Sequence, residues 1–189
     1  MAQLSREQIE ALGFDSLGED VFISDKASFY NCRHIRLGTR VRIDDFCILS
    51  AGEGGIEIGD YVHIAANSSL IGRGCIHLGD FVNLSSRVSI YSSSDDYSGI
   101  SLTNPMVPEE FKKVHHADVY LGRHVIIGSG SVVLPGSILE DGVAVGALSL
   151  IKKRCSSFSI FAGVPARKIG ERKRDLLLLE KKLLAKFPL

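Results

Sequence analysis

The chain has 189 residues, of which 45% are hydrophobic. This length and composition predict one globular domain with a sizeable core and exclude a disordered chain. No apolar run is long enough to span a bilayer and the N-terminus lacks a signal-peptide core, so we expect a cytoplasmic protein without a membrane span. The formal net charge is zero and no aromatic residues alternate with the basic ones, so a nucleic-acid partner is not expected.

Residues 1–16 are predicted to form an N-terminal helical cap. Ser5 and Gln8 have the spacing of a capping box, and Gly13 follows as a helix stop signal. We expect a short helix here that covers the first coil of the domain that follows.

Residues 17–170 are organised by an internal repeat of six residues. A pattern of an aliphatic residue, glycine, two variable residues and valine recurs, with the glycine lost in the sixth copy. The copies begin at Leu17, Leu37, Ile58, Leu78, Leu121 and Leu139, and their valines are Val21, Val41, Val62, Val82, Val125 and Val143. A period of six fits neither an α-helix nor a single strand pair, but it fits a triangular coil of three short strands and three turns.

Each copy starts a run of three hexads, and all eighteen first positions are apolar. We expect these side chains to point inward at the corners of a coil, and neighbouring coils to pair as parallel strands about 4.8 Å apart. We interpret the repeat glycine as the residue that permits the sharp turn. The sequence therefore predicts an all-β fold, a parallel β-helix of about six triangular coils whose ends need capping.

The repeat is interrupted after the fourth coil by a loop that we place at residues 92–119. A loop this long in a compact domain is usually functional. It contains Ser94, Asp95, Asp96 and Tyr97 near its start and a histidine pair near its end. We therefore expect candidate site residues among them.

Residues 171–189 are predicted to form a C-terminal helix. Its leucine stripe, Leu176, Leu179 and Leu183, is expected to pack over the last coil or onto a neighbouring subunit. Basic residues gather toward this end: residues 1–151 carry 11 Lys+Arg against 19 Asp+Glu, and residues 152–189 carry 11 against 3. This asymmetry predicts either a localised anionic partner or a solvated basic helix.

Three further motifs accompany the hexads: VIIGS at residues 125–129, VGALSLIKK at 145–153 and FAGVPARKI at 161–169. With them, residues 17–170 resemble the hexapeptide-repeat acyltransferases, above all the sugar O- and N-acetyltransferases related to galactoside and maltose acetyltransferases. The resemblance implies a left-handed parallel β-helix that moves an acetyl group from acetyl-CoA to a sugar hydroxyl or amino group, in surface polysaccharide biosynthesis. It also implies a homotrimer with each active site between adjacent subunits.

The resemblance places the acetyl-CoA co-substrate along the later coils. By motif position, backbone groups of Gly128, Ser129, Gly146 and Ala147 would line the pantetheine arm. The residues implied for the phosphates are Lys152, Lys153, Arg167 and Lys168. The charge asymmetry supports this placement independently, because the positive excess starts at Lys152 and cationic side chains pair with phosphates.

Acyl transfer to a hydroxyl needs a base, and the tetrahedral intermediate needs a hydrogen-bond donor for its oxyanion. The related O-acetyltransferases place a catalytic histidine just after the coil that precedes the long loop, and this chain has Asp95 there. Asp95 or Asp96 could be the base, orient a histidine or bind sugar hydroxyls, with Ser94 and Tyr97 as neighbouring acceptor contacts. A solvated turn is the alternative for this segment.

A second candidate base is His63, which follows a buried valine and so points outward on the third coil. Asn83 holds the equivalent place on the fourth coil, one strand spacing away. The two side chains could hold an acceptor sugar, and a plain surface histidine is the alternative. His115 and His116 could swing into the site or stay solvated.

Other functions also fit the fold. Zinc carbonic anhydrases share the trimeric β-helix, but their metal needs three histidines and this chain lacks their His-x4-His pair. The four cysteines show no CxxC pairing, so no metal is expected, and Cys47 and Cys155 fall on inward positions. A non-enzymatic sugar- or partner-binding β-helix would bind no coenzyme A. The sequence does not decide between O- and N-acetylation.

Overall fold

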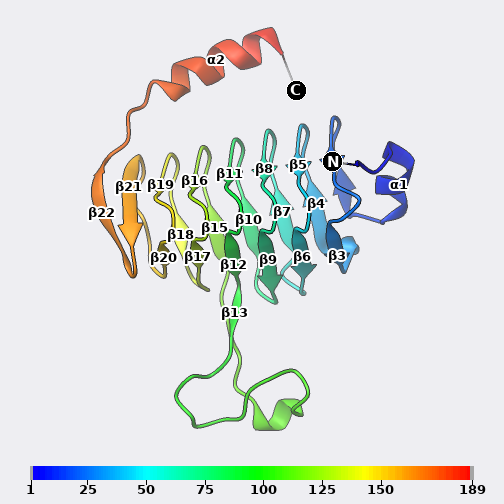
Figure 1. Ribbon diagram of the computed structural model, residues 1–189, viewed down its shortest axis with the longest axis vertical. Coiled ribbons are helices and arrows are strands. Elements are labelled where there is room, and N and C mark those ends of the chain that lie inside the picture. The colour runs from blue at the N-terminus through cyan, green and yellow to red at the C-terminus, as the bar shows by residue number, and fades with distance from the viewer. Residues whose placement is uncertain (1, 188–189) are drawn as a thin grey trace.

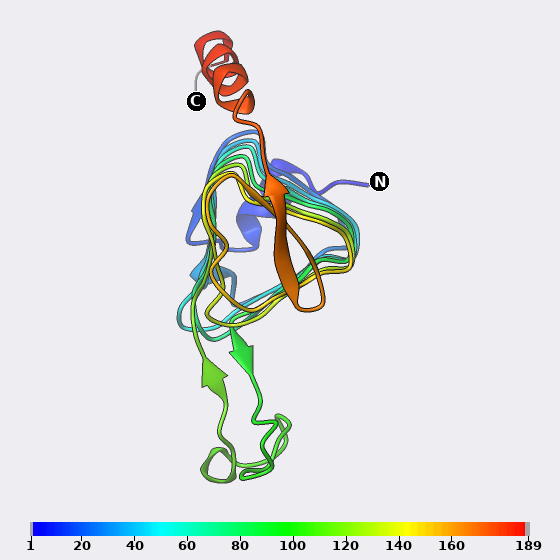
Figure 2. The ribbon, with the colours of Figure 1, turned by 90° about the vertical axis from the view of Figure 1, so that its left-hand side faces the viewer.

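The hexads wind into a three-sided prism of short parallel strands in the computed structural model, which describes residues 2–187 (Figure 1). Each coil contributes one strand to each of three sheets, and the outline is triangular when the prism is viewed along its axis (Figure 2). The predicted left-handed parallel β-helix is confirmed. We number the coils one to six by their first aliphatic residue, from Leu17 to Leu139.

The three sheets form the sides of the prism. Sheet 1 contains β1 (Ser16–Leu17), β4 (Ile35–Leu37), β7 (Ile56–Ile58), β10 (Ile76–Leu78), β15 (Val119–Leu121) and β18 (Ile138–Leu139). Sheet 2 contains β2 (Phe22–Ile23), β5 (Arg42–Ile43), β8 (His63–Ile64), β11 (Asn83–Leu84), β16 (Ile126–Ile127), β19 (Ala144–Val145), β21 (Ser159–Gly163) and β22 (Ala166–Glu171). Sheet 3 contains β3 (Ser28–Tyr30), β6 (Ile48–Ala51), β9 (Ser69–Gly72), β12 (Ser89–Tyr91), β17 (Val132–Val133) and β20 (Leu150–Ile151). A short 3-10 turn, η1 (Cys32–His34), joins β3 to β4.

The core confirms the predicted inward positions. Sixteen of the eighteen first hexad residues are buried, and the other two, Leu17 and Phe29 of coil one, are partly buried against the core. All six repeat valines are buried as well. Cys47 and Cys155 also lie in the core, where burial raises the pKa of each thiol to about 11.

The repeat glycines have a different role from the predicted one. Gly38 does not have a positive φ, and a Cβ on it would lie 2.5 Å from the carbonyl oxygen of Gly59 on the next coil. Glycine is needed there because the two backbones approach closely. The left-handed turn falls two residues later, at Arg40 and Tyr61, whose φ values are 59° and 57°. The interpretation of these glycines as the turn residues is therefore wrong.

Different elements close the two ends of the prism. At the N-terminal end, α1 (Arg6–Ala11) begins with the predicted capping box of Ser5 and Gln8 and buries Ile9 against the core. At the other end, a seventh, incomplete turn pairs with coil six, and the antiparallel hairpin β21–β22 crosses the opening (Figure 2).

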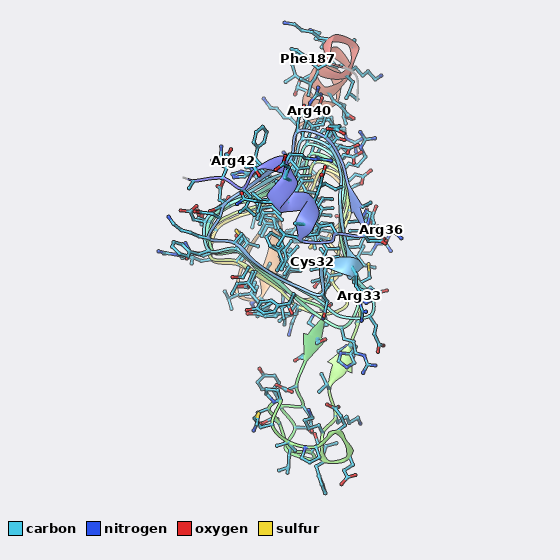
Figure 3. All side chains as sticks on the ribbon, turned by 90° about the vertical axis from the view of Figure 1, so that its right-hand side faces the viewer. Cys32, Arg33, Arg36, Arg40, Arg42 and Phe187 are labelled. Carbon is cyan, nitrogen blue, oxygen red and sulfur yellow. The ribbon has the colours of Figure 1, made fainter. Side chains whose placement is uncertain are left out.

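The C-terminal helix α2 (Leu176–Lys186) runs back along one edge of the prism and does not cover the last coil (Figure 1). It starts later than predicted because β22 extends further along the chain, and the hairpin already closes that end. Its Glu180 contacts coil five, and Figure 3 shows Phe187 near Arg40 of coil two. Residues 188–189 of the predicted C-terminal segment lie outside the described residues.

The long insertion, residues 92–118, forms an arm that projects from the prism between coils four and five (Figures 1 and 2). β13 (Ser93–Ser94) and β14 (His115–His116) pair antiparallel at its base, and the 3-10 turn η2 (Glu109–Phe111) lies further out. The arm joins the end of sheet 3 to the start of sheet 1, so it leaves the corner opposite sheet 2. Within residues 2–187, no helix has the length and hydropathy to cross a membrane.

Candidate functional site

Four hydrogen-bonded polar side chains cross the outer face of sheet 2. The Nε of Arg42 donates to Oδ1 of Asp44 at 2.8 Å, and Oδ2 of Asp44 lies 2.9 Å from Nε2 of His63. On the other side of the ring, Nδ1 of His63 lies 3.2 Å from Oδ1 of Asn83. We call these four residues the polar row. Figure 3 shows Arg42 at the upper left of the triangular outline and the arm projecting from the lower corner.

The strand register produces the polar row. Arg42, His63 and Asn83 occupy the same outward position on β5, β8 and β11, which pair in register. Such positions in neighbouring parallel strands lie about 4.8 Å apart, so side chains from coils two, three and four meet. The predicted proximity of His63 and Asn83 is confirmed. Arg42 and Asp44 were not among the predicted site residues, and the structure adds them to the row.

Asp44 is held ionised in this row. Its side chain is only 15% exposed, and burial alone would raise the pKa of the carboxyl. Hydrogen bonds from Arg42 and His63 outweigh burial and hold that pKa below its usual value. An ionised carboxylate only accepts hydrogen bonds, so Nε2 of His63 carries the shared hydrogen. In a neutral ring, Nδ1 then has the free lone pair.

The predicted loop residues lie on the arm. Asp95 is exposed, and Tyr97 is 93% exposed. The carboxylate of Asp96 accepts hydrogen bonds from Ser98 and Ser101, which lower its pKa to about 2. Asp96 therefore stabilises a turn of the arm, and its low pKa makes it a poor proton acceptor near neutral pH.

The base of the arm brings the histidine pair next to the start of the loop. Ser94 pairs with His115 across β13 and β14, and its hydroxyl donates to the backbone carbonyl of Asp95. His116 forms a 2.7 Å hydrogen bond with Ser93. Because the arm leaves the corner opposite sheet 2, a single chain does not bring these residues to the polar row.

A basic cavity lies at the C-terminal end of the prism. All four predicted phosphate-binding residues line it, together with Arg154: Lys152, Lys153, Arg167 and Lys168. Its volume is about 270 Å³, and it lies between the last coil and the β21–β22 hairpin, over an apolar floor. Cations around an apolar floor suit a ligand that has both phosphates and apolar parts.

The predicted pantetheine residues lie elsewhere. Gly128, Ser129, Gly146 and Ala147 gather at the corner between sheets 2 and 3 on coils five and six. A Cβ on Gly128 would lie 2.5 Å from the backbone nitrogen of Ala147, so this glycine also has a packing role. The structure thus gathers the predicted coenzyme residues at two places, the basic cavity and the corner between sheets 2 and 3.

Arg42 and Asp44 were not predicted as site residues, because the hexad pattern marks the buried positions and does not rank the outward ones. The available signal was a charged residue on each side of buried Ile43, in outward positions one coil before His63. No cluster of His, Cys, Asp and Glu within residues 2–187 is arranged to hold a metal ion.

Comparisons with known proteins find sugar acyltransferases among the relatives of this chain. No family model matches the chain. It is 55% identical to the dTDP-4-amino-4,6-dideoxy-D-glucose acyltransferase of Escherichia coli over 180 residues, which cover 95% of this chain and 94% of the relative. A serine variant of the N-acyltransferase AntD from Bacillus cereus, crystallised with dTDP-4-amino-4,6-dideoxyglucose and coenzyme A, has a TM-score of 0.94 and 44% identity. The match covers 98% of this chain and 99% of that one.

Another AntD structure contains dTDP and 3-hydroxybutyryl-CoA. A structure of an aspartate variant of AntD contains dTDP and coenzyme A. The substituted serine and aspartate lie ten positions apart in that protein. A maltose O-acetyltransferase from Clostridium difficile has a TM-score of 0.59 at 20% identity, covering 89% of this chain and 75% of that one, which shows a likeness of fold alone.

Proposed function

The chain belongs to the hexapeptide-repeat sugar acyltransferases, and on that premise we propose that it transfers an acyl group from acyl-CoA to the amino group of a dTDP-linked 4-amino-4,6-dideoxy sugar. The observation that carries this proposal is the 55% identity, over 95% of the chain, to an acyltransferase of that acceptor. The sequence left the acceptor group open between a hydroxyl and an amine. The likeness to this relative favours an amine. A non-enzymatic β-helix is not favoured.

The outer face of sheet 2 supports an acceptor site beside a coenzyme site. The polar row occupies coils two to four, and the same outward positions on coils five and six carry apolar Ile126 and Ala144. The predicted pantetheine residues Gly128 and Gly146 follow two positions later. A polar acceptor on the row and a coenzyme on the later coils would therefore meet near Asn83.

The reaction joins the amine nitrogen to the thioester carbon. The C–N bond forms, the C–S bond breaks, and coenzyme A leaves as its thiol. An amine needs only to be neutral to attack, so it depends less on a base than a hydroxyl does. We propose that Nδ1 of His63 accepts the proton that the attacking amine loses, because neighbouring side chains hold the ring on both sides. Asp95 then accepts a hydrogen bond that orients the amine.

The AntD variants support a role for Asp95. Their serine and aspartate are ten positions apart. Five Ser–Asp pairs of this chain have that spacing, and two of them join coil four to the arm: Ser85 with Asp95 and Ser86 with Asp96. Ser85 is half-buried two residues after Asn83, whereas Ser86 is exposed and the carboxylate of Asp96 is engaged in its turn. We therefore assign that pair to Ser85 and Asp95, and add Ser85 to the acceptor site.

A homotrimer would complete the site. Asp95 lies on an arm that leaves the corner opposite sheet 2, so the arm of one subunit would cover sheet 2 of the next. Its apolar side chains support this arrangement, because Tyr97, Ile100 and Met106 are 93%, 75% and 91% exposed and a neighbour would cover them. Ser94 and Tyr97 would then face the acceptor. Sedimentation equilibrium that finds an active monomer at assay concentration would contradict this proposal.

The charge of the basic cavity supports acyl-CoA binding. Its lysines and arginines would form charge-assisted bonds with the phosphates, and backbone groups at the corner between sheets 2 and 3 would line the pantetheine arm. We propose that the enzyme works in the cytoplasm, in surface polysaccharide biosynthesis.

A thiol-release assay with the purified protein tests the proposed function. Acetyl-CoA and 3-hydroxybutyryl-CoA serve as donors, and dTDP-4-amino-4,6-dideoxyglucose, dTDP-glucose and maltose serve as acceptors. We expect thiol release only with the amino sugar nucleotide, with an amide product by mass spectrometry. Equal release with maltose would indicate O-acetylation, and no release with any acceptor would favour the binding protein.

A further inference from the structure

The corner between sheets 2 and 3 carries a carboxylate, that of Asp44, which the fold does not require. The residues that directly follow the strands of sheet 2 on coils one to six are Ser24, Asp44, Ala65, Ser85, Gly128 and Gly146. All except Asp44 are small and uncharged, so stacking of the coils does not depend on a carboxylate here. Removing a carboxylate from water costs free energy, so a specific partner is needed to hold Asp44 at 15% exposure.

The two oxygens of Asp44 have separate partners. Oδ1 accepts from Arg42, which offsets the negative charge, and Oδ2 accepts from Nε2 of His63. Because His63 donates through Nε2, Nδ1 of the neutral ring accepts hydrogen bonds. Oδ1 of Asn83 lies 3.2 Å from Nδ1, and the oxygen and nitrogen of an amide exchange places by a flip. With its nitrogen toward the ring, this amide would donate a hydrogen bond to the lone pair of Nδ1. The ring is therefore fixed from both sides.

We infer that Asp44 is a positioning residue for acyl transfer: it fixes the Nε2–H tautomer of His63 and keeps the Nδ1 lone pair available to the acceptor amine. The inference rests on the proposed function. The amine replaces Asn83 at Nδ1 and attacks the thioester carbon, so that the C–N bond forms and the C–S bond breaks. The amine proton passes to Nδ1, Asp44 stabilises the imidazolium, and the proton then moves to the departing sulfur.

The substitution Asp44→Asn tests this role. Asparagine can donate to Nε2, which favours the opposite tautomer and places the hydrogen on Nδ1. We expect kcat with the amino sugar nucleotide to fall about a hundredfold, with KM for acyl-CoA unchanged. Nitrogen-15 NMR of the histidine ring should show Nε2–H in the wild type and Nδ1–H in the variant, a change that a merely structural role would not produce.

The neighbouring carboxylate provides a matched control. Asp45 accepts hydrogen bonds from Ser24 and Lys26, and the hydrogen bonds of the His63 ring go to Asp44 and Asn83 instead. Asp45→Asn should therefore leave kcat and the ring tautomer as in the wild type, even if the melting temperature falls.

A double variant separates positioning from folding. In the background of His63→Gln, Asp44→Asn should cause no further loss of kcat, because the residue through which it acts is gone. Wild-type activity with an unchanged tautomer in Asp44→Asn would overturn the inference and leave the proposed function intact. A wild-type protein that does not acylate the amino sugar nucleotide would instead overturn the proposed function, and the NMR result would still be readable.

Discussion

His124 and Glu180 fasten the C-terminal helix to the prism. Nε2 of His124 lies 2.8 Å from Oε2 of Glu180, and the two side chains are only 11% and 12% exposed. The same carboxylate contacts Arg123. The ring of His124 continues a stack with Phe81 and Tyr61, with centroids 4.8 and 4.9 Å apart, so α2 rests on an aromatic edge built by three coils.

Glu180→Ala should release α2 from this edge. Arg123 and His124 would lose a shared and nearly buried partner, a change that costs about 1–3 kcal/mol. We expect faster proteolytic cleavage between the hairpin and α2, with little change in the melting of the prism. Lys181→Ala, on an exposed position of the same helix, is the control. Equal cleavage rates in both variants would mean that the leucine stripe holds the helix.

His63→Gln and Asp95→Asn should separate the proton acceptor from the orienting group. Glutamine keeps hydrogen bonding but takes no proton, so kcat should fall about a hundredfold or more. Asparagine at residue 95 keeps one acceptor oxygen, so kcat/KM should fall only about tenfold. Calorimetry should find the same affinity for coenzyme A in both variants. A larger loss of kcat from Asp95→Asn than from His63→Gln would exchange the two roles.

Arg167→Ala combined with Lys168→Ala should weaken coenzyme A binding. Both side chains line the basic cavity, and losing two charge-assisted bonds should raise Kd about tenfold to a hundredfold. The control Lys181→Ala with Lys182→Ala removes the same charge from α2, outside the cavity, and should leave Kd unchanged. Calorimetric titration with coenzyme A measures both. If the two double variants bind equally well, the cavity has another ligand.

Gly38→Ala should destabilise the prism. The added methyl would lie 2.5 Å from the carbonyl oxygen of Gly59, and two stacked coils cannot separate locally without losing hydrogen bonds. A loss of about 1–3 kcal/mol in unfolding free energy is expected. Gly170→Ala meets only a side-chain atom of Ile160 at 3.9 Å and should change stability by less than about 0.5 kcal/mol. Denaturant unfolding of both variants gives the comparison.

The fold could be predicted because the same residue pattern recurs in every coil. One aliphatic residue with a valine four places on carries little information, but six copies at similar spacing specify a coil and its buried positions. The leucine stripe of α2 shows the limit of such patterns. It indicates that one face of a helix is covered, but not which surface covers it, and α2 packs along an edge that no local pattern marks.

The site was harder to predict because its parts meet only after winding. Asp44 and His63 are 19 residues apart and come together because one coil separates them. His63 has a register partner on each adjacent coil, Asn83 on coil four and Arg42 on coil two, and only the first of these pairings was predicted. The arm was found as a gap in the repeat, yet its direction could not be predicted, because residues outside the hexads share no common register.

The closed ends of the prism determine how copies of this molecule can associate. A bare last coil would offer a whole ladder of unpaired backbone groups, onto which a second molecule could continue the winding, and repetition would produce a fibre. Here α1 covers the first coil, while β22 turns the final strand direction around and carries charged Arg167, Lys168 and Glu171 along its edge. These caps disfavour end-to-end growth, so we expect copies to associate through the sides of the prism, where rotation about an axis would close an assembly of fixed size.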